Sequence, residues 1–163
     1  MSHTYLSFSI HGELFAIKVT NVLEVLQKQP ITQVPNAPNY IRGIINFRGE
    51  VVPVFETRVR FHFPPRPEED SYVIIVLDLS DNDTLLRMGA IVDRVKDVIN
   101  IEEADIKPVP PMSKEFNTDF LQGIYKQGDD FIMLLNIEKV FSSAEMHTLA
   151  ETANQNSAIV AEG

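Results

Sequence analysis

Apolar and polar residues alternate through most of the chain, which is the pattern of β-strands that bury one face. Every second residue is apolar over residues 6–10, and the alternation resumes over residues 15–19 after a short turn at residues 11–13. Two such runs joined by a glycine-containing turn are typical of a β-hairpin. We therefore expect an N-terminal hairpin with one buried face.

The next segments mix two spacings. Residues 22–26 carry apolar side chains at a helix-like spacing, although the run is too short for a free-standing helix, and residues 31–34 predict another strand. Residues 44–47 and 51–55 predict a second hairpin around an Arg-Gly turn. The second of these strands contains Pro53, which has no N–H to donate. We therefore expect it to lie at a sheet edge or to carry a bulge.

A proline-rich, charged linker covers residues 64–70, and the strand pattern then starts again. Residues 72–79 and 86–92 predict two strands joined by a polar turn at residues 80–83. The linker has no residue of core type. Its composition therefore predicts a boundary between two lobes.

The C-terminal segment changes to a helical pattern. Ser142 and Glu145 have the spacing of a capping box, and apolar residues follow at helical spacing as far as Ala153. We expect a short amphipathic helix that packs on one lobe, followed by a flexible tail over residues 152–163.

The two halves of the chain repeat one pattern. Three blocks of the first half recur in the second half in the same order: residues 19–26 as 92–99, 31–35 as 106–110 and 40–61 as 120–141. The last block aligns Gly43 with Gly123 and Val54 with Leu134 without a gap. Ordered blocks of this kind indicate two copies of one unit. Because closing a small antiparallel sheet removes its exposed edges, we expect a mainly β fold of two small five-stranded barrels, side by side, with short helices.

Composition excludes several classes of partner. The chain has 163 residues, 44% of them hydrophobic, which is enough to build a core. The net charge of −9 disfavours nucleic acids and anionic lipid surfaces. The N-terminus has no signal-peptide pattern, and the longest apolar run, residues 73–77, is too short to cross a bilayer. We expect a cytoplasmic protein with no direct membrane insertion.

No pattern of catalytic or metal-ligating residues stands out. The chain has no cysteine, its four histidines read as solvated, and its glycines are dispersed through turns rather than gathered in a phosphate-binding loop. Residues 81–83 are a poor match to a calcium loop, and the acidic pairs fall in the linker and in a tight turn. We expect neither an enzyme nor a cofactor.

Several strings resemble the CheW family of chemotaxis coupling proteins. The most specific is residues 40–54, where Asn46-Phe47-Arg48-Gly49 is similar to the family's Asn-x-Arg-Gly signature and precedes an apolar strand with proline. Other strings match in the family's order: residues 15–26, 31–38, 92–98, 120–123 and 135–139. The resemblance covers roughly residues 4 to 150.

The resemblance implies a fold of two Src-homology-3-like barrels within a single CheW-like domain over residues 1–150. We place lobe one at about 12–63, together with the C-terminal helix, and lobe two at about 71–141. The family's chain crosses between barrels, so the first strand can belong to lobe two.

The resemblance also implies a function. Family members are non-catalytic adaptors that bind the cytoplasmic tip of chemoreceptors and the regulatory domain of the histidine kinase CheA. The implied location is the cytoplasm, at membrane-associated receptor arrays, with other CheW copies in rings as further partners. A scaffold of a non-flagellar chemosensory pathway, for example one that drives pilus-based motility, stays open as an alternative.

Two functions of other classes fit less well. A small ligand in a barrel mouth is disfavoured because five-stranded barrels are filled by their own side chains. A CheW-like module fused to a receiver or kinase is disfavoured because only 22 residues follow Phe141.

The resemblance assigns receptor binding to the arginine of the signature, Arg48, although an ordinary solvated arginine at a hairpin tip would look the same. Its planar fork of donors can clamp a carboxylate or helix-end carbonyls. We expect Asn46 and Gly49 to set the turn geometry rather than to touch a partner.

Apolar residues of the two repeats are the other candidates. Core packing is the simplest interpretation for about half of them, and the others would line a groove for an amphipathic receptor helix. An acidic neighbour, Glu24, would pair with a basic receptor residue. The apolar receptor-binding candidates are Val22, Val25, Val95 and Val98.

Overall fold

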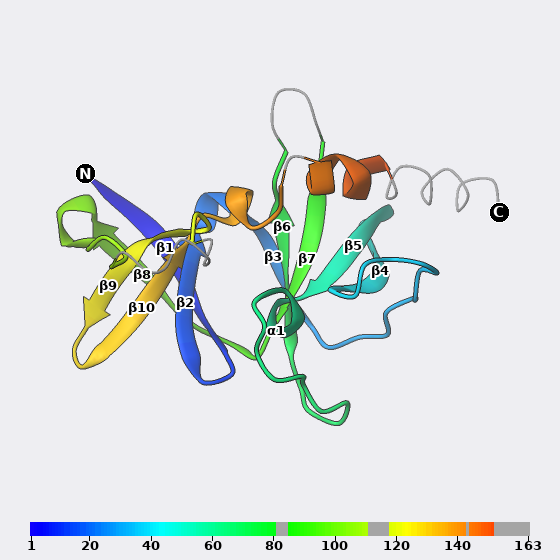
Figure 1. Cartoon of the computed structure of the whole chain (residues 1–163), viewed down its shortest axis with the longest axis horizontal. Helices are drawn as coiled ribbons and strands as arrows, with labels where there is room; N and C mark the ends of the chain where they lie inside the picture. Colours follow the sequence, from blue (N-terminus) through cyan, green and yellow to red (C-terminus); the bar gives the residue numbers. More distant parts are fainter. Residues whose placement is uncertain (81–84, 111–117, 143, 152–163) are drawn as a thin grey trace.

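Two five-stranded β-sheets lie side by side in the computed structural model, which describes residues 1–80, 85–110, 118–142 and 144–151 (Figure 1). One, the β1 sheet, has the order β8-β1-β2-β10-β9, with β8 (Arg94–Glu102), β1 (Ser2–Ile10), β2 (Glu13–Lys18), β10 (Asp130–Leu135) and β9 (Leu121–Gln127). The other, the β3 sheet, has the order β3-β6-β7-β5-β4, with β3 (Val22–Gln27), β6 (Val73–Asp78), β7 (Arg87–Val92), β5 (Glu50–Glu56) and β4 (Ile41–Phe47). The predicted mainly β fold of two five-stranded units is confirmed.

Helical segments are short. They are α1 (Thr57–Arg60), three 3₁₀ turns, η1 (Val19–Asn21), η2 (Glu103–Asp105) and η3 (Ile137–Lys139), and a helix over residues 144–151. In the part of the chain that the structure describes, no helix is long and apolar enough to span a membrane. Residues 81–83 of the turn predicted at 80–83 and the predicted tail at 152–163 lie outside the described residues.

The two sheets repeat one pairing scheme, as the sequence repeat predicts. In each sheet the four successive pairings run antiparallel, antiparallel, parallel and antiparallel. Gly43 on β4 pairs with Val54 on β5, and Gly123 on β9 pairs with Leu134 on β10. The predicted equivalence of these two pairs is confirmed.

A bulge recurs at the same place in both copies. The register of β3 against β6 shifts between Val22 and Glu24, and the register of β1 against β8 shifts between Leu6 and Phe8. In the second case the Ser7 hydroxyl accepts a hydrogen bond from the Asp97 N–H (3.0 Å) and lies 3.2 Å from the Asp97 carbonyl. The serine therefore satisfies backbone groups that the bulge leaves without strand partners.

The helix-like spacing of residues 22–26 was misleading, because this segment is strand β3. Val22, Glu24 and Leu26 are partly buried, whereas Leu23 and Val25 lie on the opposite, exposed face. An apolar side chain on the outer face of a strand breaks the period-2 pattern and imitates a helix.

Each sheet closes towards a barrel through one isolated bridge. Thr32 bridges Ile44 of β4, and Lys107 bridges Ile124 of β9. The strand predicted at residues 31–34 is therefore reduced to this single bridge. Gly43, with φ of +146°, lets the two backbones approach, because a Cβ there would overlap the Thr32 carbonyl.

The predicted lobe boundaries differ from the sheet composition. Strand β2 lies with β8–β10 rather than in a lobe at 12–63, and β6 and β7 lie with β3–β5 rather than in a lobe at 71–141. The chain crosses between sheets at η1 and again at Asp93, which separates β7 from β8. The linker at 64–70 joins α1 to β6 within one sheet and is not a lobe boundary. Dividing the chain into consecutive lobes misses these crossings, because parallel pairs such as β2–β10 join strands that are far apart in the sequence.

Three hydrophobic cores hold the fold together. One fills the β3 sheet, around Ile74 and Val76, and another fills the β1 sheet, around Tyr5 and Leu134. The largest lies between the sheets and takes residues from both, including Phe15 of β2. Central strands therefore bury both faces, and the expected single buried face of the first hairpin was wrong.

Pro53 lies in an interior strand, not at an edge, but the pairing of this strand with β4 does carry a bulge nearby, between Ile41 and Gly43. Pro53 pairs with Ile44, whose own N–H and C=O bond to Thr32 instead of β5. On the other side the pairing of β5 with β7 begins only at Val54. No hydrogen bond between strands is therefore lost through the missing N–H of Pro53.

Candidate partner-binding surface

A buried ionic network fixes the two sheets relative to each other. The Asp93 carboxylate, at the crossing between sheets, accepts hydrogen bonds from Arg58 of α1 (2.8 Å) and from the His11 N–H (2.9 Å), and it pairs with Arg66 of the linker (2.6 Å). Arg66 also pairs with Glu56 (3.1 Å). Burial alone would raise the pKa of Asp93, but hydrogen bonds from Arg58 and Arg66 hold it below its ordinary value. The linker, predicted to have no core residue, therefore supplies a buried arginine.

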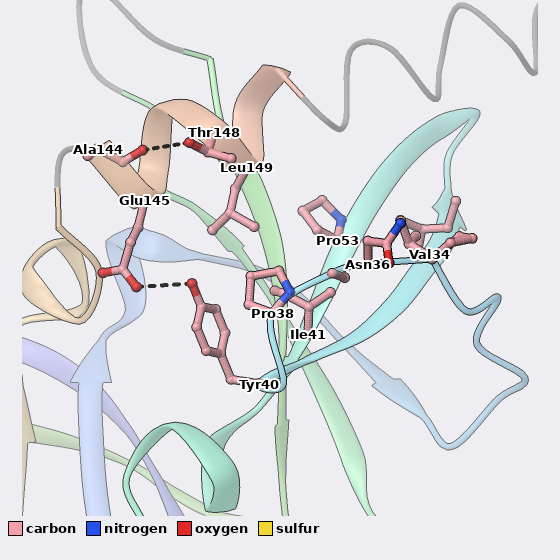
Figure 2. A pocket seen from close by; sticks show the side chains of 13 residues that line it. Val34, Asn36, Pro38, Tyr40, Ile41, Pro53, Ala144, Glu145, Thr148 and Leu149 are labelled. Atoms are coloured by element: carbon pink, nitrogen blue, oxygen red, sulfur yellow. Dashed lines mark hydrogen bonds between the residues drawn. The ribbon is translucent and has the colours of Figure 1, made fainter.

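A second cluster clamps the C-terminal helix to the β3 sheet. Arg60 donates to Glu145 (2.9 Å) and to the Val140 carbonyl (2.6 Å), and its guanidinium stacks on Tyr40 and Phe141. The Tyr40 hydroxyl donates to Glu145 as well (3.0 Å; Figure 2). The predicted capping box is present, since the Ser142 N–H donates to the Glu145 carboxylate and the Glu145 N–H donates to the Ser142 hydroxyl. These contacts hold the helix over one face of the sheet (Figure 1).

The signature arginine lies at a hairpin tip. Arg48 and Gly49 form the two-residue loop between β4 and β5, and both have positive φ, +52° and +84°. This is the conformation of a type I′ turn, in which the backbone twist matches that of the strands. The Gly49 N–H donates to the Asn46 side-chain oxygen (2.9 Å), so these two residues of the signature both contribute to the turn.

Arg48 and Glu24, two of the candidates, meet at this tip. Their side chains lie 3.4 Å apart and are 68% and 42% exposed. The Arg48 guanidinium also lies 4.8 Å from the centre of the Phe47 ring. A pair this exposed contributes little stability, but together with the ring it orients the planar fork towards solvent.

The four candidate valines divide into two kinds. Val22 and Val95 occupy equivalent places on β3 and β8 and pack partly buried against the core between the sheets. Val25 and Val98 are also equivalent, and both are exposed on strands at the ends of the two sheet orders. The structure therefore brings Val22 and Val95 to one shared core but leaves Val25 and Val98 on separate sheets.

Three exposed features escaped the sequence analysis. Leu23 is exposed on the same face of β3 as Val25. The spacing of two residues between these apolar side chains was the sequence signal that could have identified Leu23. Phe131 of β10, aligned in the repeat with a strand residue, is largely exposed, and no sequence signal marked it. Glu50, beside the Arg48 turn, pairs with Arg87 (2.6 Å).

Titratable groups do not assemble a metal site in the described ranges, where no cluster of three His, Cys, Asp or Glu side chains occurs. His147 and Glu151 do form an i, i+4 pair, with Nε2 and Oε1 3.1 Å apart, but both are exposed. His3 pairs with Glu103 across an exposed surface (3.0 Å).

Comparison with known proteins agrees with the signature and the duplicated fold. The model of the CheW-like domain matches residues 4–145. Chemotaxis protein CheW of Helicobacter pylori is 32% identical over 137 residues, which cover 83% of this chain and 79% of that protein. Protein FrzA of Myxococcus xanthus is 26% identical over 148 residues, with 90% and 89% covered.

A solved structure extends the similarity to three dimensions. The crystal structure of the scaffolding protein TtCheW from Thermoanaerobacter tengcongensis superposes with a TM-score of 0.77 at 32% identity, covering 90% of this chain and 97% of that one. The family model covers both sheets, the hairpin of Arg48 and the start of the C-terminal helix. The chain belongs to the CheW family.

Proposed function

We propose that this protein is a non-catalytic adaptor that couples the cytoplasmic tips of chemoreceptors to the regulatory domain of the histidine kinase CheA. One observation carries the proposal: the signature arginine of the family stands at an exposed turn, oriented by Glu24 and Phe47 and free of the core. A guanidinium so placed presents several hydrogen-bond donors to a partner. We propose a cytoplasmic location, at receptor arrays.

The receptor site of this proposal consists of Arg48 and Glu24 with apolar residues of the flanking strands. Val25 and Val98 are exposed and would contact a receptor helix directly. Val22 and Val95 pack partly into the core between the sheets, so their contribution would be to shape the surface between them.

Kinase binding would use the loop-rich ends of the sheets. The family resemblance extends to the regulatory domain of CheA, and the internal repeat of this chain gives it two similar ends. We expect one end of this protein to bind the opposite end of the kinase domain. Such a heterologous contact closes into rings when the rotation between the two proteins permits. Other copies of this chain would join the same rings.

A titration tests the proposal. The full chain is titrated against a receptor cytoplasmic fragment and, separately, against the CheA regulatory domain. We expect saturable binding to each and a ternary complex when all three are mixed. Absence of binding to both partners would contradict the adaptor function.

The similarity to protein FrzA supports a second candidate, an adaptor of another chemosensory pathway. In that case the same adaptor would serve a non-flagellar output such as pilus-based motility. Deletion of the gene distinguishes the two, since loss of directed swimming favours the first output and loss of directed surface movement favours the second.

A further inference from the structure

An apolar pocket of about 350 Å³ lies between the β3 sheet and the C-terminal helix (Figure 2). Its walls come from the loop at residues 34–38, from β4 and β5, and from the helix. Figure 2 shows Leu149 pointing from the helix into the space bounded by Pro53 and Ile41. Most of its lining is prolines and aliphatic side chains, so it suits one or two aliphatic groups. The polar residues that also line it are Asn36, Tyr40, Glu145 and Thr148.

The pocket is preformed because its walls are fixed independently. The helix is held by Arg60 and Tyr40 through Glu145. On the opposite wall, Ile44 exchanges two backbone hydrogen bonds with Thr32, 2.8 and 3.0 Å long, at the base of the loop. A ligand would therefore bind without first paying for ordering of either wall.

The chain itself carries a matching ligand. The described part of the helix reaches Glu151, only two residues beyond the pocket wall at Leu149. Residues 152–157 are mostly polar, and Ala158-Ile159-Val160-Ala161 follow as the apolar stretch of the last twelve residues. We propose that Ile159 and Val160 dock into this pocket of the same molecule, with residues 152–157 as the tether.

Length and concentration favour docking in the same molecule. Ile159 lies eight residues beyond Glu151, where the described helix ends, and eight extended residues reach up to roughly 26 Å, which is ample for a return to the adjacent pocket. A tether this short gives an effective local concentration of about a millimolar or more, well above that of a second copy in dilute solution.

Because the chain has no cysteine, disulfide trapping in the full chain tests the proposal without background. The test variant is Ala37→Cys with Ala161→Cys, which places one thiol on the pocket loop and the other just after Val160. The control is Ala37→Cys with Asn154→Cys. The 154 pair measures how fast the tether itself brings a thiol to the loop, without the apolar residues beyond it.

We expect the 161 pair to form its intramolecular disulfide at least about ten times faster than the 154 pair, because docking raises the local thiol concentration. Adding Ile159→Asp and Val160→Asp should abolish that advantage, whereas Asn156→Asp, which adds charge to the tether alone, should preserve it. Equal rates for the two pairs would overturn the proposal. So would cross-linking whose yield rises with protein concentration, since that places the tail on a second copy.

A measurement without cysteines gives the same decision. Methyl NMR of the full chain should show that Ile159→Asp shifts the signals of Ile41, Ile44 and Leu149, while Asn156→Asp leaves them in place. If neither variant moves these signals, the tail does not occupy the pocket. The proposed adaptor function is independent of this outcome.

Discussion

Arg66 and Asp93 form a 2.6 Å ion pair at the point where the chain crosses from one sheet to the other. Arg66 comes from the polar linker, yet its side chain is only 5% exposed, and its second partner, Glu56, is 2% exposed. The linker is thus fastened to the β3 sheet at a point that also contacts the first hairpin through His11. This network, and not the linker's composition, defines the boundary between the two sheets.

Removing the arginine should therefore destabilise the whole protein. Arg66→Ala leaves Glu56 buried without its cation, and breaking a buried pair in this way costs about 3–5 kcal/mol of unfolding free energy. Urea unfolding at pH 7 measures the loss. The control is Arg94→Ala, an exposed arginine of β8, for which we expect a change within about 0.5 kcal/mol. Equal effects of the two substitutions would contradict the assigned role of Arg66.

Acid should weaken the attachment of the C-terminal helix. Burial raises the pKa of Glu145, but hydrogen bonds from Arg60, from the Ser142 N–H and from Tyr40 outweigh it and lower the pKa from 4.5 to about 2. Because the folded-state pKa lies below the unfolded one, ionised Glu145 stabilises the fold fully above pH 4.5, and this stabilisation is lost as the pH falls towards 2.

The corresponding experiment compares Glu145→Gln with the wild type across this range. We expect the variant to have a lower free energy of unfolding at pH 7 and the difference to shrink below pH 4.5. Glu69→Gln, an exposed linker substitution, serves as the control and should show no such dependence. A difference between Glu145→Gln and wild type that stays constant with pH would show that the carboxylate charge is not responsible.

The close approach at Gly43 predicts a strong steric effect. In Gly43→Ala the new methyl would overlap the Thr32 carbonyl, and the φ of +146° is unfavourable for alanine. We expect a loss of about 3 kcal/mol or more, from strain and overpacking together. Gly12→Ala is the matched control, because its φ is +80° but no atom lies within 4 Å of the added Cβ, so only backbone strain of about 1–2 kcal/mol is expected. Melting temperatures of the two variants give the comparison.

Local patterns predicted the parts of the fold that depend on neighbours in sequence. The hairpin around Arg48 and the equivalence of Gly43 with Gly123 follow from short-range turns and from an ungapped repeat. The exchange of β2 for β6 and β7 between lobes could not be predicted, because it depends on parallel pairing between segments such as Ala16 and Leu134, far apart in the chain.

The candidate site was likewise predictable only where it depends on neighbours in sequence. The Arg-Gly dipeptide indicated an exposed turn, but nothing in the sequence placed Glu24 beside it, since the contact joins different strands. The valines could not be sorted by periodicity, because Val22 and Val25 face opposite sides of one strand. Burial of Arg66 was hidden for another reason: its acidic partners, Glu56 and Asp93, come from separate elements.

The turn geometry of Arg48 sharpens the central functional test. Arg48 has a φ of +52°, so it lies at a special backbone position and not at an ordinary exposed one. Arginine and alanine both tolerate this region poorly, and Arg48→Ala should therefore change stability by only about 0.5 kcal/mol. Arg48→Gly removes the backbone strain and should raise the melting temperature.

The wild type and these two variants together separate an effect on folding from an effect on binding. If Arg48 contacts the receptor, Arg48→Ala and Arg48→Gly should both lose about 1.5–3 kcal/mol of receptor binding, roughly one to two orders of magnitude in affinity, although one is as stable as the wild type and the other more so. Arg48→Lys should recover only part of the affinity, because an ammonium lacks the planar fork. Kinase binding should be nearly unchanged in all three variants of Arg48, since it is assigned to the ends of the sheets. Titration against a receptor fragment, with a melt of each variant, decides the matter. Wild-type affinity in the more stable Arg48→Gly variant would remove Arg48 from the receptor site.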